Sequence, residues 1–282
     1  MTEPAGPHSS GTLYVVATPI GNLGDISARA LEVLRSVAVV AAEDTRVTRK
    51  LWSRFGIETP LLSYHAHSGR GRAAELLLRL EGGEDVALVT DAGTPLVSDP
   101  GNELVEAWIA AGGVVVPVPG ASAVLAALMV AGIAAPRWGF EGFLPRKGRE
   151  RRGRLARVAA DDRATVLFEA PGRTATTLRD LAEACGPSRQ AAVARELTKM
   201  HEEVRRGSLG QLAAEAAAQP VRGEVVIVVA GADEVETAAL GLEAGRTRVD
   251  QLVAEGVKRS AAARMVAQET GLPRRELFAT DD

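Results

Sequence analysis

Short apolar, β-branched runs alternate with helical segments along the first half of the chain, and this alternation constrains the fold more than any other feature. Five runs read as buried strands, and the segments between them carry apolar residues at helical spacing. Repeated strand–helix–strand units predict a largely parallel sheet with helices on both faces, which is an α/β fold. The predicted strands are residues 13–17, 37–41, 61–64, 85–89 and 114–118.

Local signals mark where several helices begin and end. Ser27 can accept a hydrogen bond at the start of one helix. A second predicted helix covers residues 45–55 and stops at Gly56. Asp99 and Pro100 predict the start of a third, with the aspartate as cap and the proline at the first helical position.

The pattern resumes after Pro145, with predicted strands at 165–168, 190–194 and 224–229 and helices that begin near Arg173 and Ser208. Residues 233–246 read as a linker. We therefore expect two α/β domains with a disordered segment before them and helices after them. The expected parts are a disordered tail over 1–11, an N-terminal α/β domain over 12–120, a C-terminal α/β domain over 121–232 and a small helical tail over 245–282.

Composition excludes several classes of protein. The net charge of −3 means that no global positive field attracts nucleic acid, so any basic site must be local. Cys185 is the single cysteine, which excludes an intrachain disulfide and agrees with a cytoplasmic location. The longest apolar stretch, residues 121–135, is short for a bilayer span and contains Ser122 and Gly132. We expect a buried helix there and no membrane association.

Four loops rich in glycine and proline directly follow apolar strands. In open parallel sheets, ligands bind beyond the carboxyl ends of the strands, and glycine lets the backbone approach a ligand closely. One such loop alone is usually an ordinary turn, but four together predict a binding site. Neither a dinucleotide fingerprint nor a P-loop motif is present, which disfavours nicotinamide, flavin and nucleoside triphosphate binding. The loops are residues 18–25, 90–101, 117–122 and 169–173.

The motifs of these and neighbouring loops resemble the tetrapyrrole-methylase superfamily of S-adenosylmethionine-dependent methyltransferases. They are VATPIGNLGDIS, AAEDTR, LVTDAGTPLVSDPG, PVPGASA, GFLPRKGRER, LFEAPGRT and RELTKMHEEVRRG, in that order. Within the superfamily the chain most resembles the ribosomal RNA small-subunit methyltransferase I family, which methylates a cytidine 2′-oxygen in 16S rRNA. The first loop reads ATPIGN where porphyrin and cobalamin-precursor methylases usually carry G-x-G-P-G-D-P, which favours the RNA branch.

This resemblance implies a fold, a cofactor and partners. The fold is two α/β domains of the tetrapyrrole-methylase (class III) type with a C-terminal helical segment. The cofactor is S-adenosylmethionine, and the partners are 16S rRNA, within a small ribosomal subunit particle, and a second copy of the chain. The residues expected to line the cofactor cleft are Pro19, Gly21, Asp91, Gly93, Thr94, Ser98, Gly120, Ala121 and Ser122.

A ribose hydroxyl is a weak acid, so its methylation benefits from a general base or from stabilisation of the alkoxide. Lys199 can serve as a base with a lowered pKa or as a cation beside the oxygen, and Glu202, three residues on, can lie on the same side. The alternative for Glu202 is a solvated charge run. We expect no metal, because His65 and His67 have no third ligand nearby. The catalytic candidates are Lys199, Glu202, Asp44, Arg46 and Glu169.

Residues 146–157 carry seven basic residues and one acidic residue in an otherwise acidic chain. Guanidinium groups pair with phosphates bidentately, so this segment is the expected RNA contact. A solvated helix face is the alternative. The residues expected to bind RNA are Arg146, Lys147, Arg149, Arg151, Arg152 and Arg154.

Two other functions compete with RNA methylation. A C-methyltransferase acting on a tetrapyrrole would have a roomy apolar cleft and no need for the arginine cluster. A non-enzymatic RNA-binding protein of ribosome assembly would not require intact cofactor loops, yet here the loops are intact.

Overall fold

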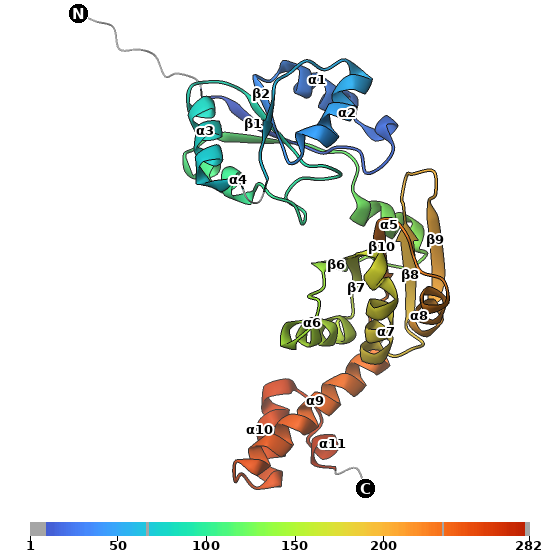
Figure 1. Ribbon diagram of the computed structural model, residues 1–282. Helices are drawn as coiled ribbons and strands as arrows, with labels where there is room; N and C mark the ends of the chain where they lie inside the picture. Colours follow the sequence, from blue (N-terminus) through green and yellow to red (C-terminus); the bar gives the residue numbers. More distant parts are fainter. Residues whose placement is uncertain (1–9, 66–67, 233, 280–282) are drawn as a thin grey trace, which may run out of the picture. The chain divides into compact units, whose positions relative to one another are not determined.

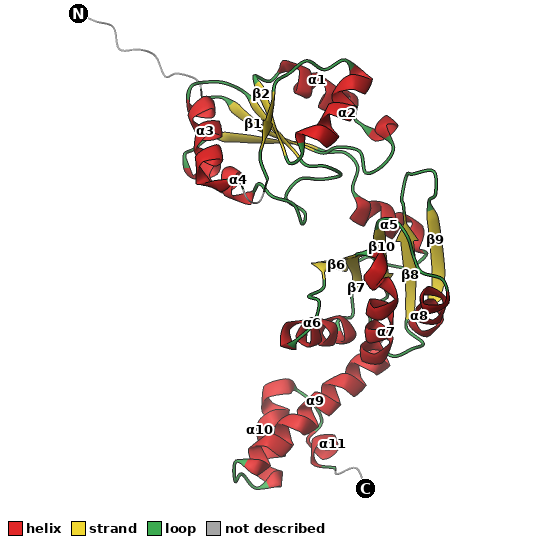
Figure 2. Cartoon of the chain, in the orientation of Figure 1, coloured by secondary structure: helices red, strands yellow, loops and turns green. Residues whose placement is uncertain are grey.

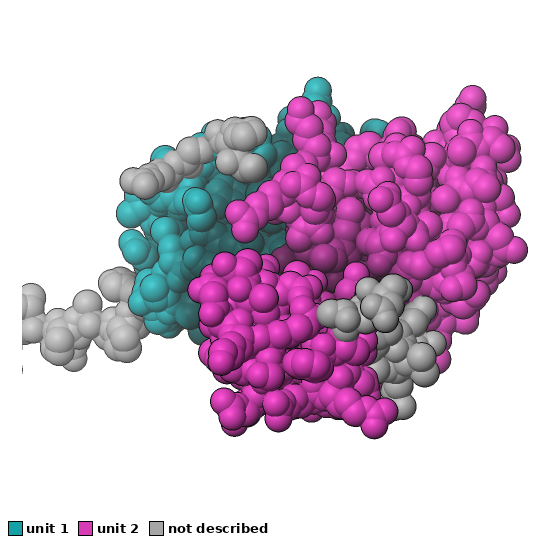
Figure 3. All heavy atoms as spheres, turned by 90° about the horizontal axis from the view of Figure 1, so that it is seen from below, with its two compact units in different colours: residues 1–126, 196–203 teal, residues 127–195, 204–282 magenta. Residues whose placement is uncertain are grey.

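The structure is a computed structural model that describes residues 10–65, 68–232 and 234–279. The chain forms two compact units, residues 1–126 with 196–203 and residues 127–195 with 204–282 (Figure 3). The first unit thus extends past the expected boundary at 120, and a short segment from the second half joins it. The expected disordered tail lies almost wholly outside the described residues.

The first unit contains a five-stranded sheet with the order β3-β2-β4-β1-β5, in which all neighbours are parallel (Figures 1 and 2). Each predicted strand of this half is confirmed, with ends that differ by at most two residues. Pro117 lies in an edge strand, where its missing N–H is tolerated. The strands are β1 (Thr12–Val16), β2 (Val39–Ala42), β3 (Leu61–Ser63), β4 (Val86–Val89) and β5 (Val114–Val118).

Helices cover both faces of this sheet, as predicted. On one face Val40 and Ala42 pack with Leu34 of α1 (Ala28–Ser36) and Trp52 of α2 (Thr45–Phe55). On the other face the alternate residues of β2 pack with α3 (Gly69–Glu81) and α4 (Asn102–Ala110). Successive side chains of a strand point to opposite faces, so β2, buried on both, reads as a continuous apolar run.

The second unit has a sheet with the order β6-β7-β10-β8-β9, and here the prediction of a parallel sheet is wrong. Strand β10 runs antiparallel to both β7 and β8, and only β6 and β7 are paired in parallel among the registers of this sheet in the described residues. A strand buried on both faces has the same apolar sequence in either direction, so the chain's local pattern does not reveal its orientation. The strands are β6 (Trp138–Phe143), β7 (Ala164–Glu169), β8 (Gln190–Arg195), β9 (Glu203–Ser208) and β10 (Val225–Val229).

Three helices bury their apolar sides in the core of the second unit. Leu155, Leu178 and Leu212, one from each helix, belong to the same buried cluster as Ile227 of β10. Ser208 caps the last of these helices in a capping box with Gln211, as its sequence position predicts. The helices are α6 (Arg149–Ala160), α7 (Thr174–Cys185) and α8 (Leu209–Ala218).

Three features differ from the predictions. Strands β6 and β9 were missed, because one is glycine-rich and the other is highly charged. Contrary to the prediction, Asp99 does not cap helix α4. The helix begins at Asn102, and its N-cap is Gly101, whose φ of 127° is a conformation that glycine adopts readily. The expected linker over 233–246 is helical from residue 234 onward.

The C-terminal segment is a small helical bundle, as predicted, although it begins earlier than expected. Val249, Val266 and Leu277 form a buried cluster of their own. Within the described residues, no helix combines the length and the hydropathy that a membrane span requires. The helices are α9 (Glu234–Ala254), α10 (Arg259–Thr270) and α11 (Arg274–Phe278).

Candidate active site

Three loops interlock at the carboxyl edge of the first sheet, one after each of β1, β4 and β5. The backbones of Thr18 and Gly93 exchange two hydrogen bonds, of 2.9 and 3.1 Å. The Thr18 hydroxyl donates to the carbonyl of Thr90 at 3.1 Å, and the Thr94 hydroxyl donates to the carbonyl of Ala121 at 3.2 Å. These bonds join the three loops into one rim, which we call the loop rim.

Two glycines of the loop rim stand where a side chain would collide with a neighbour. Gly93 has φ +83°, and a Cβ there would lie 3.2 Å from Cγ2 of Ile20. A Cβ at Gly120 would lie 3.1 Å from the Cβ of Ala17. The rim therefore presents bare backbone, whose N–H and C=O groups can contact a ligand directly.

The loop after β4 also stores backbone strain. Leu96 and Ser98 have φ of 73° and 67°, a region that residues with a side chain rarely adopt. Such conformations cost free energy and cluster at ligand-binding sites. Ser98 is exposed in this strained turn.

Three carboxyl groups of the first unit have a raised pKa. Burial is the main cause for Glu43, which follows β2, and for Asp91 and Asp99 in the loop after β4. Burial, together with the nearby charges of Glu43 and Asp91, raises the pKa of Asp99 to about 6. A cationic ligand group nearby would relieve this repulsion, so this edge favours a ligand that carries positive charge.

Asp99→Asn tests this electrostatic strain. The pKa of Asp99 in the fold, about 6, exceeds its ordinary value of 3.8, so any stability linked to this group is present at low pH and is lost as the pH rises through 6. We expect the substitution to raise the free energy of unfolding at pH 7.5 by about 1–2 kcal/mol, after allowance for partial solvation of the carboxyl. Urea unfolding at pH 7.5 and pH 4 measures the gain, and an equal gain at both would contradict the assignment.

Asp44 and Arg46 form the N-terminal cap of α2. The Asp44 carboxylate accepts a hydrogen bond of 2.8 Å from the backbone N–H of Arg46 and pairs with its guanidinium at 2.6 Å. The backbone N–H of Asp44 in turn donates to Asp91 at 2.9 Å. The hydrogen bonds from Arg46 lower the pKa of Asp44 to about 2, which makes it a weak base. This geometry favours a structural role for Asp44, in which it caps α2 and orients Asp91, and disfavours a role as proton acceptor.

A segment from the second half of the chain, residues 196–203, packs against the loop after β1. The backbone N–H of Asn22 donates to Oγ1 of Thr198 at 3.2 Å. A Cβ at Gly21 would lie only 2.3 Å from Cγ of Lys199, so the glycine makes room for the lysine stem. The structure thus brings a predicted cofactor residue and a predicted catalytic residue, 178 positions apart in sequence, into contact.

The conformation of this segment is strained and internally bonded. Glu196 and Thr198 have φ of 51° and 65°. The Lys199 ammonium pairs with Oε1 of Glu196 at 2.9 Å, while Glu202 accepts a hydrogen bond of 2.6 Å from the backbone N–H of Thr198. Glu196 was missed by sequence reasoning, although its three-residue spacing to Lys199 was a usable signal. Glu202 holds the turn.

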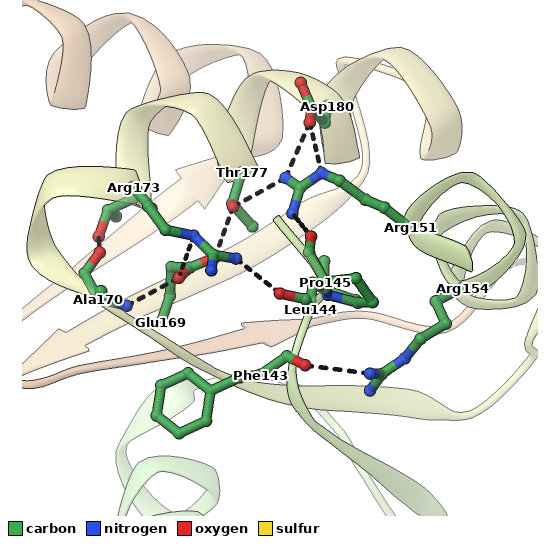
Figure 4. A network of polar contacts seen from close by, with 11 residues as sticks. Phe143, Leu144, Pro145, Arg151, Arg154, Glu169, Ala170, Arg173, Thr177 and Asp180 are labelled. Atoms are coloured by element: carbon green, nitrogen blue, oxygen red, sulfur yellow. Dashed lines mark hydrogen bonds and ion pairs between the residues drawn. The ribbon is translucent and has the colours of Figure 1, made fainter. Parts of the chain in front are cut away.

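Glu169 lies in the second unit and is engaged on all sides (Figure 4). Its side chain is 1% exposed. It accepts from the Ala170 N–H at 2.8 Å, from the Thr177 hydroxyl at 2.6 Å, and from two nitrogens of Arg173 at 3.0 Å each. A carboxylate with its lone pairs occupied and no exposed surface cannot take a proton from a ribose. The expected catalytic role of Glu169 is therefore replaced by a structural one.

The basic segment divides into buried and exposed groups. Arg151 is 8% exposed and bonds to Asp180, Pro145 and Thr177, so its guanidinium is buried and already engaged within the unit. Arg154 bonds to Glu141 and Phe143. We remove both arginines from the expected RNA contacts. The exposed members of the expected set are Arg146, Lys147, Arg149 and Arg152.

The expected cofactor residues fall together in the first unit. All nine lie in the loops after β1, β4 and β5. The fourth glycine-rich loop, residues 169–173, follows β7 of the other sheet, so the four loops do not share one sheet edge. Among the described residues, no group of three or more histidine, cysteine or acidic side chains could hold a metal ion.

Comparisons with known proteins identify the family. The family model described as Tetrapyrrole (Corrin/Porphyrin) Methylases matches residues 12–213. Ribosomal RNA small subunit methyltransferase I of Synechocystis sp. is 48% identical over 95% of this chain and 96% of that protein. The proteins of the same name from Pseudomonas aeruginosa and Bacillus subtilis are 49% and 39% identical, over 96% and 97% of this chain and 96% and 94% of theirs.

Solved structures share the fold at lower identity. A cobalt precorrin-4 methyltransferase is 21% identical with a TM-score of 0.61, over 80% of this chain and 97% of its own. A uroporphyrin-III C-methyltransferase of Thermus thermophilus, complexed with S-adenosylhomocysteine, is 18% identical with a TM-score of 0.57, over 78% and 97%.

Proposed function

The chain belongs to the tetrapyrrole methylases and, within them, to the ribosomal RNA small subunit methyltransferase I family, and we propose that it transfers a methyl group from S-adenosylmethionine to the 2′-oxygen of a cytidine in 16S rRNA. The observation that carries this proposal is the loop rim, with the Lys199 segment packed against it. It combines a backbone surface for a cofactor with a cationic side chain for the acceptor oxygen.

The loop rim fits S-adenosylmethionine by its chemistry. The cofactor has a cationic amino group and a cationic sulfur, and the rim offers bare peptide groups beside carboxylates whose pKa is raised. Asp91 would receive hydrogen bonds from the amino group or the ribose. When bound, the cofactor supplies a methyl carbon that is attacked in line with its sulfur. Strong anionic contact at the sulfur would oppose the reaction, because the positive charge disappears there, so neutral backbone suits it.

Lys199 would act on the acceptor oxygen. Its pairing with Glu196 at 2.9 Å favours the charged ammonium, which stabilises negative charge that develops on the ribose oxygen. Glu196 orients the ammonium, and Glu202 holds the turn through the backbone of Thr198. In this arrangement the main contributions are positioning and electrostatic stabilisation.

The exposed basic side chains of the second unit would bind the RNA backbone. Changing Arg146, Lys147, Arg149 and Arg152 together to alanine is expected to lower RNA affinity and to reduce the slope of log K against log salt by up to about 4, since each lost phosphate contact removes about one. Affinity for S-adenosylmethionine should not change. A matched variant, R179A/R222A, removes exposed arginines elsewhere in the unit and should keep the slope. An unchanged slope in the quadruple variant would favour a solvated helix face.

The test of the function itself is a map of ribose methylation. Small ribosomal subunits from cells without this protein should lack one 2′-O-methylcytidine, and the purified protein with S-adenosylmethionine should restore it. We propose that the small-subunit particle, within the cytoplasm, is the substrate and that two copies of the chain act together. Exposed Met129 of α5 (Ala123–Ala131) supplies apolar surface for such an association. Light scattering of the purified protein measures its mass.

A further inference from the structure

Three buried or half-buried arginines hold the backbone that leads into the basic helix α6. Arg154 donates to the carbonyl of Phe143, Arg173 to that of Leu144 at 2.7 Å, and Arg151 to that of Pro145 at 2.9 Å (Figure 4). Arg154 also donates to the carbonyl of Glu141. These four carbonyls span the end of β6 and the turn after it. The turn continues directly into Arg146 and Lys147, which are exposed.

This stretch needs external support, because its own sequence gives it little. β6 is an edge strand, and its register shifts between Phe140 and Gly142. Helix α6 begins after Gly148, which has φ +95° and supplies no side-chain cap. One backbone bond, from the Arg152 N–H to the Gly148 carbonyl at 3.3 Å, marks the helix start. The contacts from Arg151 and Arg154 of α6, and from Arg173, fix the strand end and the turn before it.

Two of these arginines, Arg151 and Arg173, are ordered by one connected network. Glu169 binds Arg173 and the Thr177 hydroxyl, and that hydroxyl accepts a 3.0 Å hydrogen bond from Arg151. Arg151 also pairs with Asp180 at 2.8 Å. The Arg154–Glu141 pair, at 2.7 Å, holds the end of β6 separately. Arg157 and Arg179 also lie within 4 Å of Glu141 and Asp180. The carboxylates thus hold Arg151, Arg154 and Arg173 in place and offset their charge.

We propose that Glu169, Arg173, Thr177 and Arg151 form a positioning network that presets the turn at residues 144–148, so that the exposed basic side chains meet RNA phosphates without a further ordering cost. The proposal rests on the RNA-binding function proposed above. A preset surface binds more tightly than one that must order on contact. The network residues touch no phosphate, and this separates them from the exposed basic residues in an experiment.

Arg173→Lys and Thr177→Val test the network. Lysine keeps the charge but cannot bridge Glu169 and the Leu144 carbonyl with a planar fork, and valine removes the hydroxyl at similar volume. Arg163→Lys is the matched control, because Arg163 also pairs with a carboxylate, Asp161, but lies before the opposite end of β7. Hydrogen exchange of residues 143–149 should accelerate in both test variants and stay unchanged in the control.

RNA binding supplies the second measurement. With small ribosomal subunits that lack the modification, the dissociation constant and KM of both test variants should rise about tenfold, as expected for one or two residues that must be ordered on binding. The salt slope and kcat should match those of the wild type, because the bound state neutralises the same phosphates. A slope reduced by about one in a third variant, Arg173→Met, which removes the charge, would make Arg173 a phosphate contact and overturn the proposal.

Two further outcomes have defined meanings. Wild-type exchange and affinity in both test variants, or an equal loss in Arg163→Lys, would overturn the positioning role. If the wild-type protein itself neither binds nor methylates small subunits, the RNA function fails. Accelerated exchange at 143–149 would in that case still support the network as the device that orders the turn.

Discussion

Lys199→Met is expected to slow methyl transfer by about 10²–10⁴-fold, the range in which a positioned acid, base or charge contributes to a reaction. Methionine keeps the length and the apolar stem that crosses Gly21, so the packing of the segment against the loop after β1 should persist. The ammonium that pairs with Glu196 is lost. Single-turnover methylation of small ribosomal subunits measures the rate, and calorimetry with S-adenosylmethionine should show affinity close to that of the wild type.

Two companion variants sharpen this experiment. Lys50→Met removes an exposed lysine from α2 in the same unit and should leave the rate unchanged. Lys199→Arg keeps the charge but cannot give up its proton. Partial activity in Lys199→Arg supports charge stabilisation, whereas loss equal to that of methionine supports proton transfer. A near-normal rate in Lys199→Met would remove this residue from the mechanism and direct attention to Glu43 and Arg46.

Gly93→Val is expected to weaken S-adenosylmethionine binding by about 10²-fold, the size of effect that a displacement near 1 Å can cause at a preorganised site. A β-branched residue is strained at φ +83°, and its Cβ would lie 3.2 Å from Cγ2 of Ile20, in the loop after β1. Gly93 also bonds Thr18 in both directions, so a shift of its backbone would separate the loops that form the rim.

Gly112→Val is the matched control for Gly93→Val. Gly112 has a similar φ of +79°, but a Cβ there meets no atom within 4 Å. Both variants therefore share the backbone strain, and only one of them disturbs the rim. Calorimetry gives the affinities, and thermal unfolding measures the strain common to both. Equal affinities for the cofactor in the two variants would place the binding surface elsewhere.

Much of the fold could be predicted from local patterns. Apolar runs of four or five residues between amphipathic segments predicted all five strands of the first sheet and their parallel direction, because strands joined through a crossover helix run parallel. The helix over 45–55 with Gly56 as its end was predicted to the residue, since a glycine after the last turn is a local signal. Its cap, Asp44, was seen only in the structure. The antiparallel direction of β10 could not be predicted, because the direction of a fully buried strand depends on partners distant in the sequence.

The candidate site shows the same division. Gly93 and Gly120 were expected in the cofactor cleft because of the family resemblance of their loops, and in the structure both lie in the loop rim. The role of Glu169 could not be predicted, because a carboxylate reads the same whether it faces a substrate or lies buried among Arg173 and Thr177. The same holds for Arg151. Its charge predicted a contact with an RNA phosphate, but in the structure it is buried and pairs with Asp180.

The sequence by itself determined the strand and helix alternation, the glycine-rich loops at the strand ends and the chemical character of the basic segment, because each depends on neighbours within a few residues. Only the tertiary structure decided which side chains are available for chemistry. It brought Lys199 against Gly21 across most of the chain, and it divided the seven basic residues of the 146–157 segment into an exposed set and a buried set. Those outcomes depend on burial and on long-range hydrogen bonds, which exist only after the chain has folded.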